Sequence, residues 1–320
     1  MRVAIVGVGG MGTTHFNIHR DMEGTTLVAA CDLMLDQLKA KAEGLSINLY
    51  SDYYEMLERE KPDVVDVSTP TYLHAEHAIA AMRAGAHVIC EKPMALTRDE
   101  AEEIIKVSKE TGKLFMAAHV LRFMGPYAYL SDVIKSGKHG KPLKIYMSRL
   151  SSTPLWSYEG WMLDRSRSGH VVLDLMIHDI DLMQYLFGQP REITGAQMEM
   201  NELTNYASVC FIYDGFSISI EGSWFNTEIP FTSEFFAVFE NGWVRFKDGV
   251  LADNGSIVDL DKSDVVENTG INISSADGYA QEIRHFIECV RSGNTPVVTP
   301  ESSADSVSLV HRTLDALKKI

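Results

Sequence analysis

The sequence has few of the features that mark secreted, membrane or nucleic-acid-binding proteins. Its 320 residues include four cysteines, far apart and without a C-x-x-C pair, so we expect reduced, buried thiols rather than a disulfide framework. Positive charge is scarce, since 29 Lys and Arg stand against 44 Asp and Glu, which argues against a nucleic-acid partner. No signal peptide and no bilayer-spanning apolar run is visible, which predicts a cytoplasmic protein with no membrane partner.

The length and the pattern of apolar residues predict two domains. In the first, residues 1–121, short apolar runs at 3–6, 27–31, 64–67, 87–90 and 114–118 alternate with helical stretches at 34–43, 74–84 and 98–111. Continuous apolarity is typical of strands buried on both faces of a parallel sheet. The alternation therefore predicts an α/β domain of the Rossmann type.

The second domain, residues 122–320, has a different pattern of apolar and polar residues. Runs at 205–213, 216–224, 233–240 and 243–247 alternate partly in steps of two, and Asp214-Gly215 and Asn241-Gly242 are typical of two-residue hairpins. Helices are expected at 173–187 and 278–291, covering one face of the sheet, and at 302–318. We therefore expect an α+β domain with a large, mainly antiparallel open sheet.

A glycine-rich turn, Gly7-Val8-Gly9-Gly10-Met11-Gly12, follows the first apolar run. The G-x-G-x-x-G pattern is weak by itself, but here it lies between a strand and a helix. In this context the glycines allow a tight turn, approach to a pyrophosphate and close packing of helix on strand. The turn predicts a bound dinucleotide at the helix N-terminus.

Asp32 follows the second apolar run, about 20 residues beyond the last glycine, where a carboxylate binds the adenosine ribose. A 2′-phosphate would be repelled there, so NAD is favoured over NADP. The alternative is that Asp32 caps the helix that follows it.

Two more turns end strands of the first domain. Ser68-Thr69-Pro70 and His74 follow one strand, and Glu91-Lys92-Pro93 follows the next. In open parallel sheets ligands bind at the carboxyl ends of strands. From spacing alone, the Glu91–Lys92 pair is as compatible with a solvated loop as with an ammonium that reaches a substrate hydroxyl.

In the expected helix 173–187, Asp174, His178, Asp181 and Tyr185 lie on one face of an otherwise apolar segment. His178 is a candidate general base and Asp174 a candidate partner that orients its ring. The alternatives are a purely structural histidine or a pair of metal ligands. We expect no metal. Asp179 and Asp181 are expected to serve structure.

These motifs, in this order, resemble the glucose–fructose oxidoreductase / inositol dehydrogenase / MocA (Gfo/Idh/MocA) family. The resemblance rests on the Gly7 turn, Thr69-Pro70 with His74, Glu91-Lys92-Pro93, Arg122-Phe123 with Pro126-Tyr127, Asp174 with His178-Asp179 and Asp181, and Tyr279 with Glu282 and Phe286. It implies that Lys92 binds the reacting hydroxyl beside the nicotinamide and that Lys92, Asp174 and His178 are catalytic, with His178 the base. A departure is Ser168-Gly169-His170, where the family has a run of glycines.

The expected binding residues follow from position and resemblance. Those for the cofactor are Gly7, Gly9, Gly10, Met11, Gly12, Asp32, Ser68, Thr69, Pro70, His74, Glu91 and Lys92. Those for the substrate are Lys92, Arg122, Tyr158, Trp161, His170 and His178, because aromatic faces and polar donors suit hydroxyl-rich ligands.

The sequence thus predicts an NAD-dependent oxidoreductase that acts on a secondary hydroxyl of a cyclic polyol, sugar or glycoside. Two alternatives remain open: an NAD-dependent glycosidase that works by oxidation and elimination, and a non-catalytic NAD-binding sensor or repressor. The resemblance also implies a homodimer or homotetramer formed through the second domain's sheet. The apolar run Phe235, Phe236, Val238 and Phe239 loosely supports it.

Overall fold

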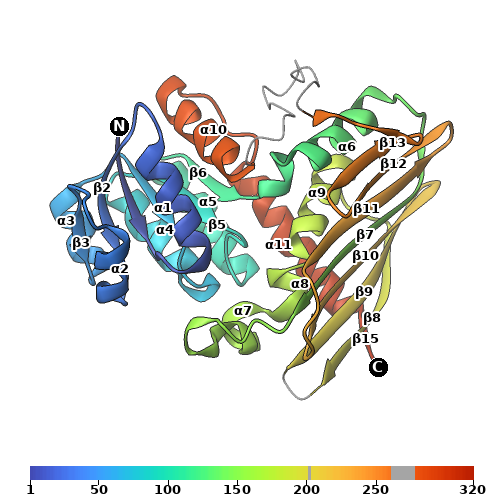
Figure 1. Cartoon of the computed structure of the whole chain (residues 1–320), viewed down its shortest axis with the longest axis horizontal. Coiled ribbons are helices and arrows are strands. Elements are labelled where there is room, and N and C mark those ends of the chain that lie inside the picture. The colour runs from blue at the N-terminus through green and yellow to red at the C-terminus, as the bar shows by residue number, and fades with distance from the viewer. Residues whose placement is uncertain (201–202, 261–277) are drawn as a thin grey trace. The chain divides into compact units, whose positions relative to one another are not determined.

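The computed structural model describes residues 1–200, 203–260 and 278–320 (Figure 1). By its internal contacts the chain divides into two compact units. The first comprises Met1–His119 and Tyr279–Ala304, and the second Val120–Gly278 and Asp305–Ile320. The division expected from sequence, 1–121 and 122–320, places the boundary between the units within three residues of the one observed. It does not anticipate that Tyr279–Ala304 belongs to the first unit.

The first unit contains a six-stranded parallel sheet in the order β3-β2-β1-β4-β5-β6. Its strands are β1 (Arg2–Val6), β2 (Thr26–Cys31), β3 (Asn48–Tyr50), β4 (Val64–Val67), β5 (His87–Glu91) and β6 (Phe115–Ala118). Its helices are α1 (Gly10–Asp21), α2 (Leu35–Lys41), α3 (Tyr53–Glu60), η1 (Thr71–Leu73), α4 (His74–Arg83), α5 (Arg98–Thr111) and α10 (Gly278–Ser292). This order confirms the expected Rossmann fold.

The strands of this sheet form where the sequence is mainly apolar. Every residue of β4 and of β6 is buried, as expected for strands covered on both faces. Local signals also set helix ends: the spacing of Thr97 and Glu100 in the sequence predicts a capping box, and the two residues form one at the start of α5.

The second unit contains a nine-stranded sheet in the order β14-β13-β12-β11-β7-β10-β9-β8-β15. Its strands are β7 (Pro142–Ser152), β8 (Glu192–Met200), β9 (Thr204–Tyr213), β10 (Phe216–Phe225), β11 (Thr232–Phe239), β12 (Gly242–Lys247), β13 (Val250–Asp253), β14 (Ser256–Ile257) and β15 (Lys318–Lys319). Its helices are η2 (Val120–Arg122), α6 (Gly125–Ser136), η3 (Tyr158–Leu163), α7 (Arg165–Ser168), α8 (His170–Asp174), α9 (Ile177–Phe187) and, from Asp305 onward, α11 (Pro300–Ala316).

This sheet is mainly antiparallel, as expected, with parallel pairs at β7–β10 and β8–β15. Burial alternates strictly along β9, so one face forms a core, on the side where Figure 1 shows α6, α8 and α9. Asp214-Gly215 makes the predicted two-residue turn, since Tyr213 pairs with Phe216. The next turn is Glu240-Asn241 and not Asn241-Gly242, because Phe239 pairs with Gly242.

Two expectations for the second region were wrong. The helix expected to cover this sheet from residue 278 is grouped from Tyr279 with the first unit, where Arg291 donates to the Gly24 carbonyl oxygen at 2.5 Å. The single helix expected at 173–187 is divided into α8 and α9.

Candidate functional site

The glycine turn connects β1 to α1 at the carboxyl edge of the first unit's sheet. Gly7 has a φ of +83°, and a Cβ there would lie 2.6 Å from the Ser68 carbonyl carbon. A Cβ at Gly12 would lie 2.0 Å from the Gly7 carbonyl oxygen. Only glycine fits these two positions, because one has a left-handed backbone and both face backbone atoms that cannot rotate away.

The N-terminus of α1 is built to accept an anion. Its N-cap residue, Gly9, offers no side-chain cap, and the first turn carries no acidic residue. Apart from its chain neighbours, no residue that the structure describes comes within 4 Å of a Cβ placed on Gly9, and Met11 is exposed. The first N–H groups and the helix dipole therefore suit a phosphate group, so the residues present fit the pyrophosphate of a dinucleotide.

Asp32 lies directly beyond the end of β2, beside this turn. Its carboxylate accepts hydrogen bonds from the Val8 N–H at 2.7 Å and the Met34 N–H at 2.8 Å. It does not cap α2, whose N-cap position is Met34. Each carboxylate oxygen keeps a lone pair, which suits the two ribose hydroxyls.

Sequence reasoning missed Lys41 at this turn. Its ammonium donates to the Val8 carbonyl oxygen and to the Thr13 hydroxyl, the latter at 2.7 Å. Lys41 lies at the end of α2, about 30 residues after the glycine motif, and no local pattern in the sequence identifies this contact.

The turns after β4 and β5 lie at the same edge, because β1, β4 and β5 are parallel neighbours. After β4, the Ser68 hydroxyl donates to Asp66 at 2.8 Å, and Pro70 precedes η1. The ring of His74 is buried between the carbonyl oxygens of Thr69 and Pro93, 2.7 Å from each.

After β5, the buried Glu91 carboxylate accepts the Lys92 N–H at 3.0 Å, and Lys92 itself is half-buried. Burial alone would raise the pKa of Glu91, but the nearby charges of His15 and Lys92 hold it below its ordinary value. The pair is therefore not a solvated loop entrance. Glu91 is a fixed, ionised support for the backbone of Lys92.

In the second unit, Asp174 ends α8 and His178 lies in the first turn of α9. The hydrogen-bonded helix stops at Asp174 and resumes at Ile177, but the backbone between them keeps right-handed helical angles. A shared face for Asp174 and His178 therefore stays a prediction. Asp174 is buried and His178 half-buried. Met176, within the interruption, packs on the sheet at Gly222, where an added Cβ would lie 2.4 Å from its Cγ.

Asp179 and Asp181 hold the second unit together. Asp179 pairs with the buried Arg149 at 2.9 Å, and Asp181 pairs with Arg122 at 2.6 Å. The Arg122 guanidinium is buried and also lies 4.4 Å from the centre of the Tyr185 ring. These contacts give Arg122 a structural role, and its substrate contact stays a prediction.

The remaining substrate candidates lie on and after η3. Tyr158 is exposed and Trp161 half-buried. His170 has a φ of +58°, and its ring contacts Asn205 Nδ2 at 3.0 Å and the Leu163 carbonyl oxygen at 3.1 Å. Both ring nitrogens are thus engaged within the unit, and contact of these three residues with a substrate stays a prediction.

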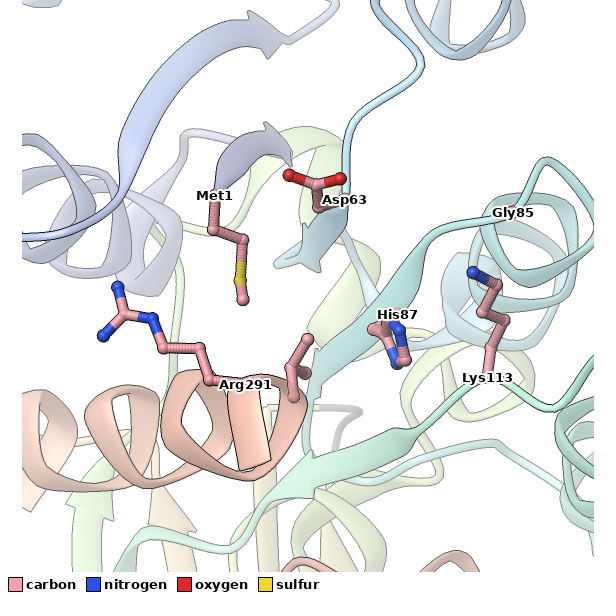
Figure 2. A pocket seen from close by; sticks show the side chains of 7 residues that line it. Met1, Asp63, Gly85, His87, Lys113 and Arg291 are labelled. Carbon is pink, nitrogen blue, oxygen red and sulfur yellow. The ribbon is translucent and has the colours of Figure 1, made fainter. Parts of the chain in front are cut away.

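A cavity of about 400 Å³ lies at the opposite edge of the first unit's sheet (Figure 2). Its lining includes Asp63, His87, Lys113 and Arg291, which precede or begin strands or end α10. Ligands of doubly wound sheets bind at the carboxyl edge, so this cavity is not the dinucleotide site.

Within residues 1–200, 203–260 and 278–320, no helix is both long and apolar enough to cross a membrane. Over the same ranges, no group of three or more His, Cys, Asp or Glu side chains is arranged to hold a metal ion.

Two family models match the chain. Residues 1–119 match one described as "Oxidoreductase family, NAD-binding Rossmann fold", and residues 127–245 match the "GFO/IDH/MocA C-terminal domain". The first match covers the whole Rossmann sheet, and the second begins within α6 and ends within β12.

Individual proteins are similar over different lengths. The 2,7-anhydro-N-acetylneuraminate hydratase of Mediterraneibacter gnavus is 34% identical over 60% of this chain, which spans only 50% of that relative. The scyllo-inositol 2-dehydrogenase (NAD(+)) of Bacillus subtilis is 29% identical, covering 93% of this chain and 89% of the relative. The crystal structure of myo-inositol 2-dehydrogenase from Lactobacillus plantarum has a TM-score of 0.81 at 25% identity, over 99% of this chain and 96% of that one.

Proposed function

We propose, from the premise that this chain belongs to the Gfo/Idh/MocA oxidoreductase family, that it oxidises a secondary hydroxyl of a cyclic polyol, sugar or glycoside with NAD. The observation that carries the proposal is the Glu91–Lys92 turn. A buried carboxylate fixes the backbone of a half-buried lysine at the sheet edge that also holds the glycine turn. The names of the inositol dehydrogenases support the substrate class.

Lys92 has the first role in the proposed reaction. Its ammonium donates a hydrogen bond to the reacting hydroxyl oxygen and stabilises the negative charge that develops on it. NAD, when bound, supplies the acceptor for the hydride that leaves the same carbon.

His178 has the second role, removal of the hydroxyl proton. Asp174 is proposed to orient the ring or favour its charged form, acting through His178. Because the helix is interrupted between the two residues, this pairing rests on the family resemblance and not on helical spacing. Arg122, Tyr158, Trp161 and His170 are proposed to contact the substrate hydroxyls.

NAD is proposed as the preferred dinucleotide. The Asp32 carboxylate accepts hydrogen bonds from ribose hydroxyls but repels a 2′-phosphate. Its two backbone hydrogen bonds, to Val8 and Met34, hold it beside the glycine turn.

The test measures the reduction of NAD, through the absorbance of the reduced cofactor, with a panel of inositols, hexoses and glycosides. At least one should give turnover that Lys92→Met and His178→Asn each remove without loss of folding. The matched controls are Lys106→Met, at an exposed lysine of α5, and His87→Asn, at the opposite sheet edge. Full activity in Lys92→Met or His178→Asn would show that the assigned roles are wrong.

A second candidate is favoured by the hydratase relative. Addition of water causes no net oxidation of the substrate. A hydratase that uses NAD, or a glycosidase that oxidises and then reduces its substrate, therefore returns the cofactor to its oxidised form in each turnover. Turnover of a glycoside or anhydro sugar with no accumulated reduced cofactor identifies this route. Dinucleotide-dependent binding to another protein, with no turnover on any of these compounds, would instead indicate a sensor.

Self-association is proposed through the open face of the second unit's sheet. Phe236 is 40% exposed there, and its ring packs edge-on against Trp243 with centroids 5.9 Å apart. An interface on this face would cover the aromatic pair. Sedimentation of wild type and of Phe236→Lys should show an oligomer that the substitution weakens, and a wild-type monomer would contradict the proposal.

A further inference from the structure

Four ionisable side chains are buried together in the first unit, below the turns that follow β4 and β5. His15 and His19 lie one turn apart on α1, Asp66 lies on β4 and Glu91 ends β5. His15 and Asp66 have no exposed surface, and Glu91 is 8% exposed. Charges at such depth persist only where they are paired and hydrogen-bonded.

His15 lies between the two carboxylates. Its Nδ1 is 2.9 Å from an Asp66 oxygen, and its Nε2 is 3.2 Å from a Glu91 oxygen. The Nδ1–Asp66 contact is a hydrogen bond, and the Nε2–Glu91 contact is an ion pair without hydrogen-bond alignment. Two carboxylates this close to one ring favour its positively charged form. In agreement, although burial opposes it, the two carboxylates hold the pKa of His15 well above its ordinary value.

Asp66 connects this cation to the turn after β4. It also accepts hydrogen bonds from His19 Nε2 and from the Ser68 hydroxyl, each at 2.8 Å. Its oxygens are thus occupied from α1 and from its own strand. Besides these groups, the ring of Tyr279, on α10, lies 6.5 Å from that of His15.

Glu91 connects the same cation to Lys92. One of its oxygens contacts His15, and the other accepts the Lys92 N–H at 3.0 Å. On the far side of Lys92, the Pro93 carbonyl oxygen contacts His74 at 2.7 Å. Two buried histidines, each from a different helix, thus hold the turn that carries Lys92.

A buried ion pair adds little net stability, since apolar side chains of similar size often serve equally well. What apolar side chains cannot do is accept a backbone N–H at a defined point. We propose that His15, Asp66 and Glu91 form a positioning network that fixes the backbone of Lys92 and so orients its ammonium. The inference rests on the proposed function of Lys92 and adds His15 and Asp66 as residues on which that function depends.

Loss of the charge on His15 should disturb the network at Glu91. Asp66 and Glu91 are then two carboxylates without the cation between them, and Glu91 moves or takes up a proton. Its hold on the Lys92 N–H weakens. The expected result is a kcat lower by ten- to a hundredfold, on the order of the loss for a catalytic group misplaced by about 1 Å.

The experiment compares three variants of the full chain. His15→Gln removes the cation, and Glu91→Gln keeps an acceptor for Lys92 but removes a charge. The double variant removes both charges, so it should recover part of the lost kcat. His19→Gln is the matched control, because it removes a buried histidine and a hydrogen bond to Asp66 but leaves His15 between the two carboxylates; it should keep the wild-type kcat.

Two readouts do not depend on turnover. Amide hydrogen exchange of the peptide that contains Lys92 should become faster in His15→Gln and stay unchanged in His19→Gln. The Kd for NAD, from quenching of protein fluorescence, should change by less than about threefold, well under the tenfold that 1.4 kcal/mol produces. If His15→Gln does not fold, the kcat of Glu91→Gln against that of His19→Gln gives the comparison, because Glu91→Gln removes the charge that faces His15.

Unchanged exchange and unchanged kcat in both single variants, with Lys92→Met inactive, would overturn the positioning network but leave the proposed function intact. A fully active Lys92→Met overturns the proposed function, and the exchange readout then still decides whether the network holds the turn.

Discussion

Gly12 and Gly9 make it possible to separate the packing of the glycine turn from its binding of dinucleotide. A Cβ at Gly12 would lie 2.0 Å from the Gly7 carbonyl oxygen and 2.8 Å from its carbonyl carbon. Both are backbone atoms, so Gly12→Ala must displace α1 from the turn. Overpacking of this kind costs about 3 kcal/mol, of which the better helix propensity of alanine returns about 1 kcal/mol. We expect a net loss of about 2 kcal/mol.

Gly9 has the opposite character. Among the described residues, only its chain neighbours come within 4 Å of its Cβ position, so Gly9→Ala should lower the stability by at most about 1 kcal/mol. If the pyrophosphate approaches the backbone here, as it does in this motif, the added methyl group lies in its way. We expect NAD to bind at least about tenfold more weakly.

Urea denaturation measures the first effect and titration of protein fluorescence with NAD the second. Gly12→Ala should be less stable than Gly9→Ala, and Gly9→Ala should be folded but weak in NAD binding. Wild-type stability of Gly12→Ala would refute the packing argument. Wild-type NAD affinity of Gly9→Ala would refute the placement of the pyrophosphate.

Three further predictions concern Asp32, Arg149 and His15. Asp32→Ser should weaken NAD binding about tenfold, by loss of hydrogen bonds to a charged group, and should improve NADP binding. Titration with both dinucleotides checks this, and an unchanged ratio of the Kd for NAD to the Kd for NADP would contradict it. Arg149→Met leaves Asp179 buried without its partner and should cost about 3–5 kcal/mol in urea denaturation, whereas a loss under about 1 kcal/mol contradicts the pairing. Because the folded pKa of His15 is raised, His15 contributes fully to the free energy of unfolding below its unfolded pKa of about 6.5. Above that pH its contribution falls by about 1.4 kcal/mol per pH unit, until the folded pKa is reached. A plot of the free energy of unfolding against pH should show this slope for the wild type and not for His15→Gln. The same slope in both would rule out His15 as its source.

The parts of the fold that sequence predicted are those with local signals. The apolar runs of β1, β4 and β5, the capping box at Thr97 and the turn at Asp214-Gly215 each depend on neighbouring residues. The glycine turn and Asp32 were identifiable for the same reason, because a strand, a turn and a helix follow in a fixed order.

The parts that sequence could not predict depend on residues far apart in the chain. The run from Leu173 to Phe187 is apolar enough for one helix, but its interruption lies where Met176 packs against Gly222 of the sheet. His15 is 51 residues from Asp66, so no spacing rule connects them. Arg122 matched a family motif, yet only the structure shows its guanidinium paired with Asp181.

The central claim is that a hydride passes from a substrate carbon to NAD with net oxidation. The most direct measurement uses myo-inositol deuterated at its ring carbons, or the equivalent labelled polyol that gives turnover, with wild-type protein and unlabelled NAD. Mass spectrometry of the recovered cofactor should show one deuterium in the reduced nicotinamide and an equal amount of ketone product. Product formed while the cofactor stays oxidised and unlabelled would contradict the claim.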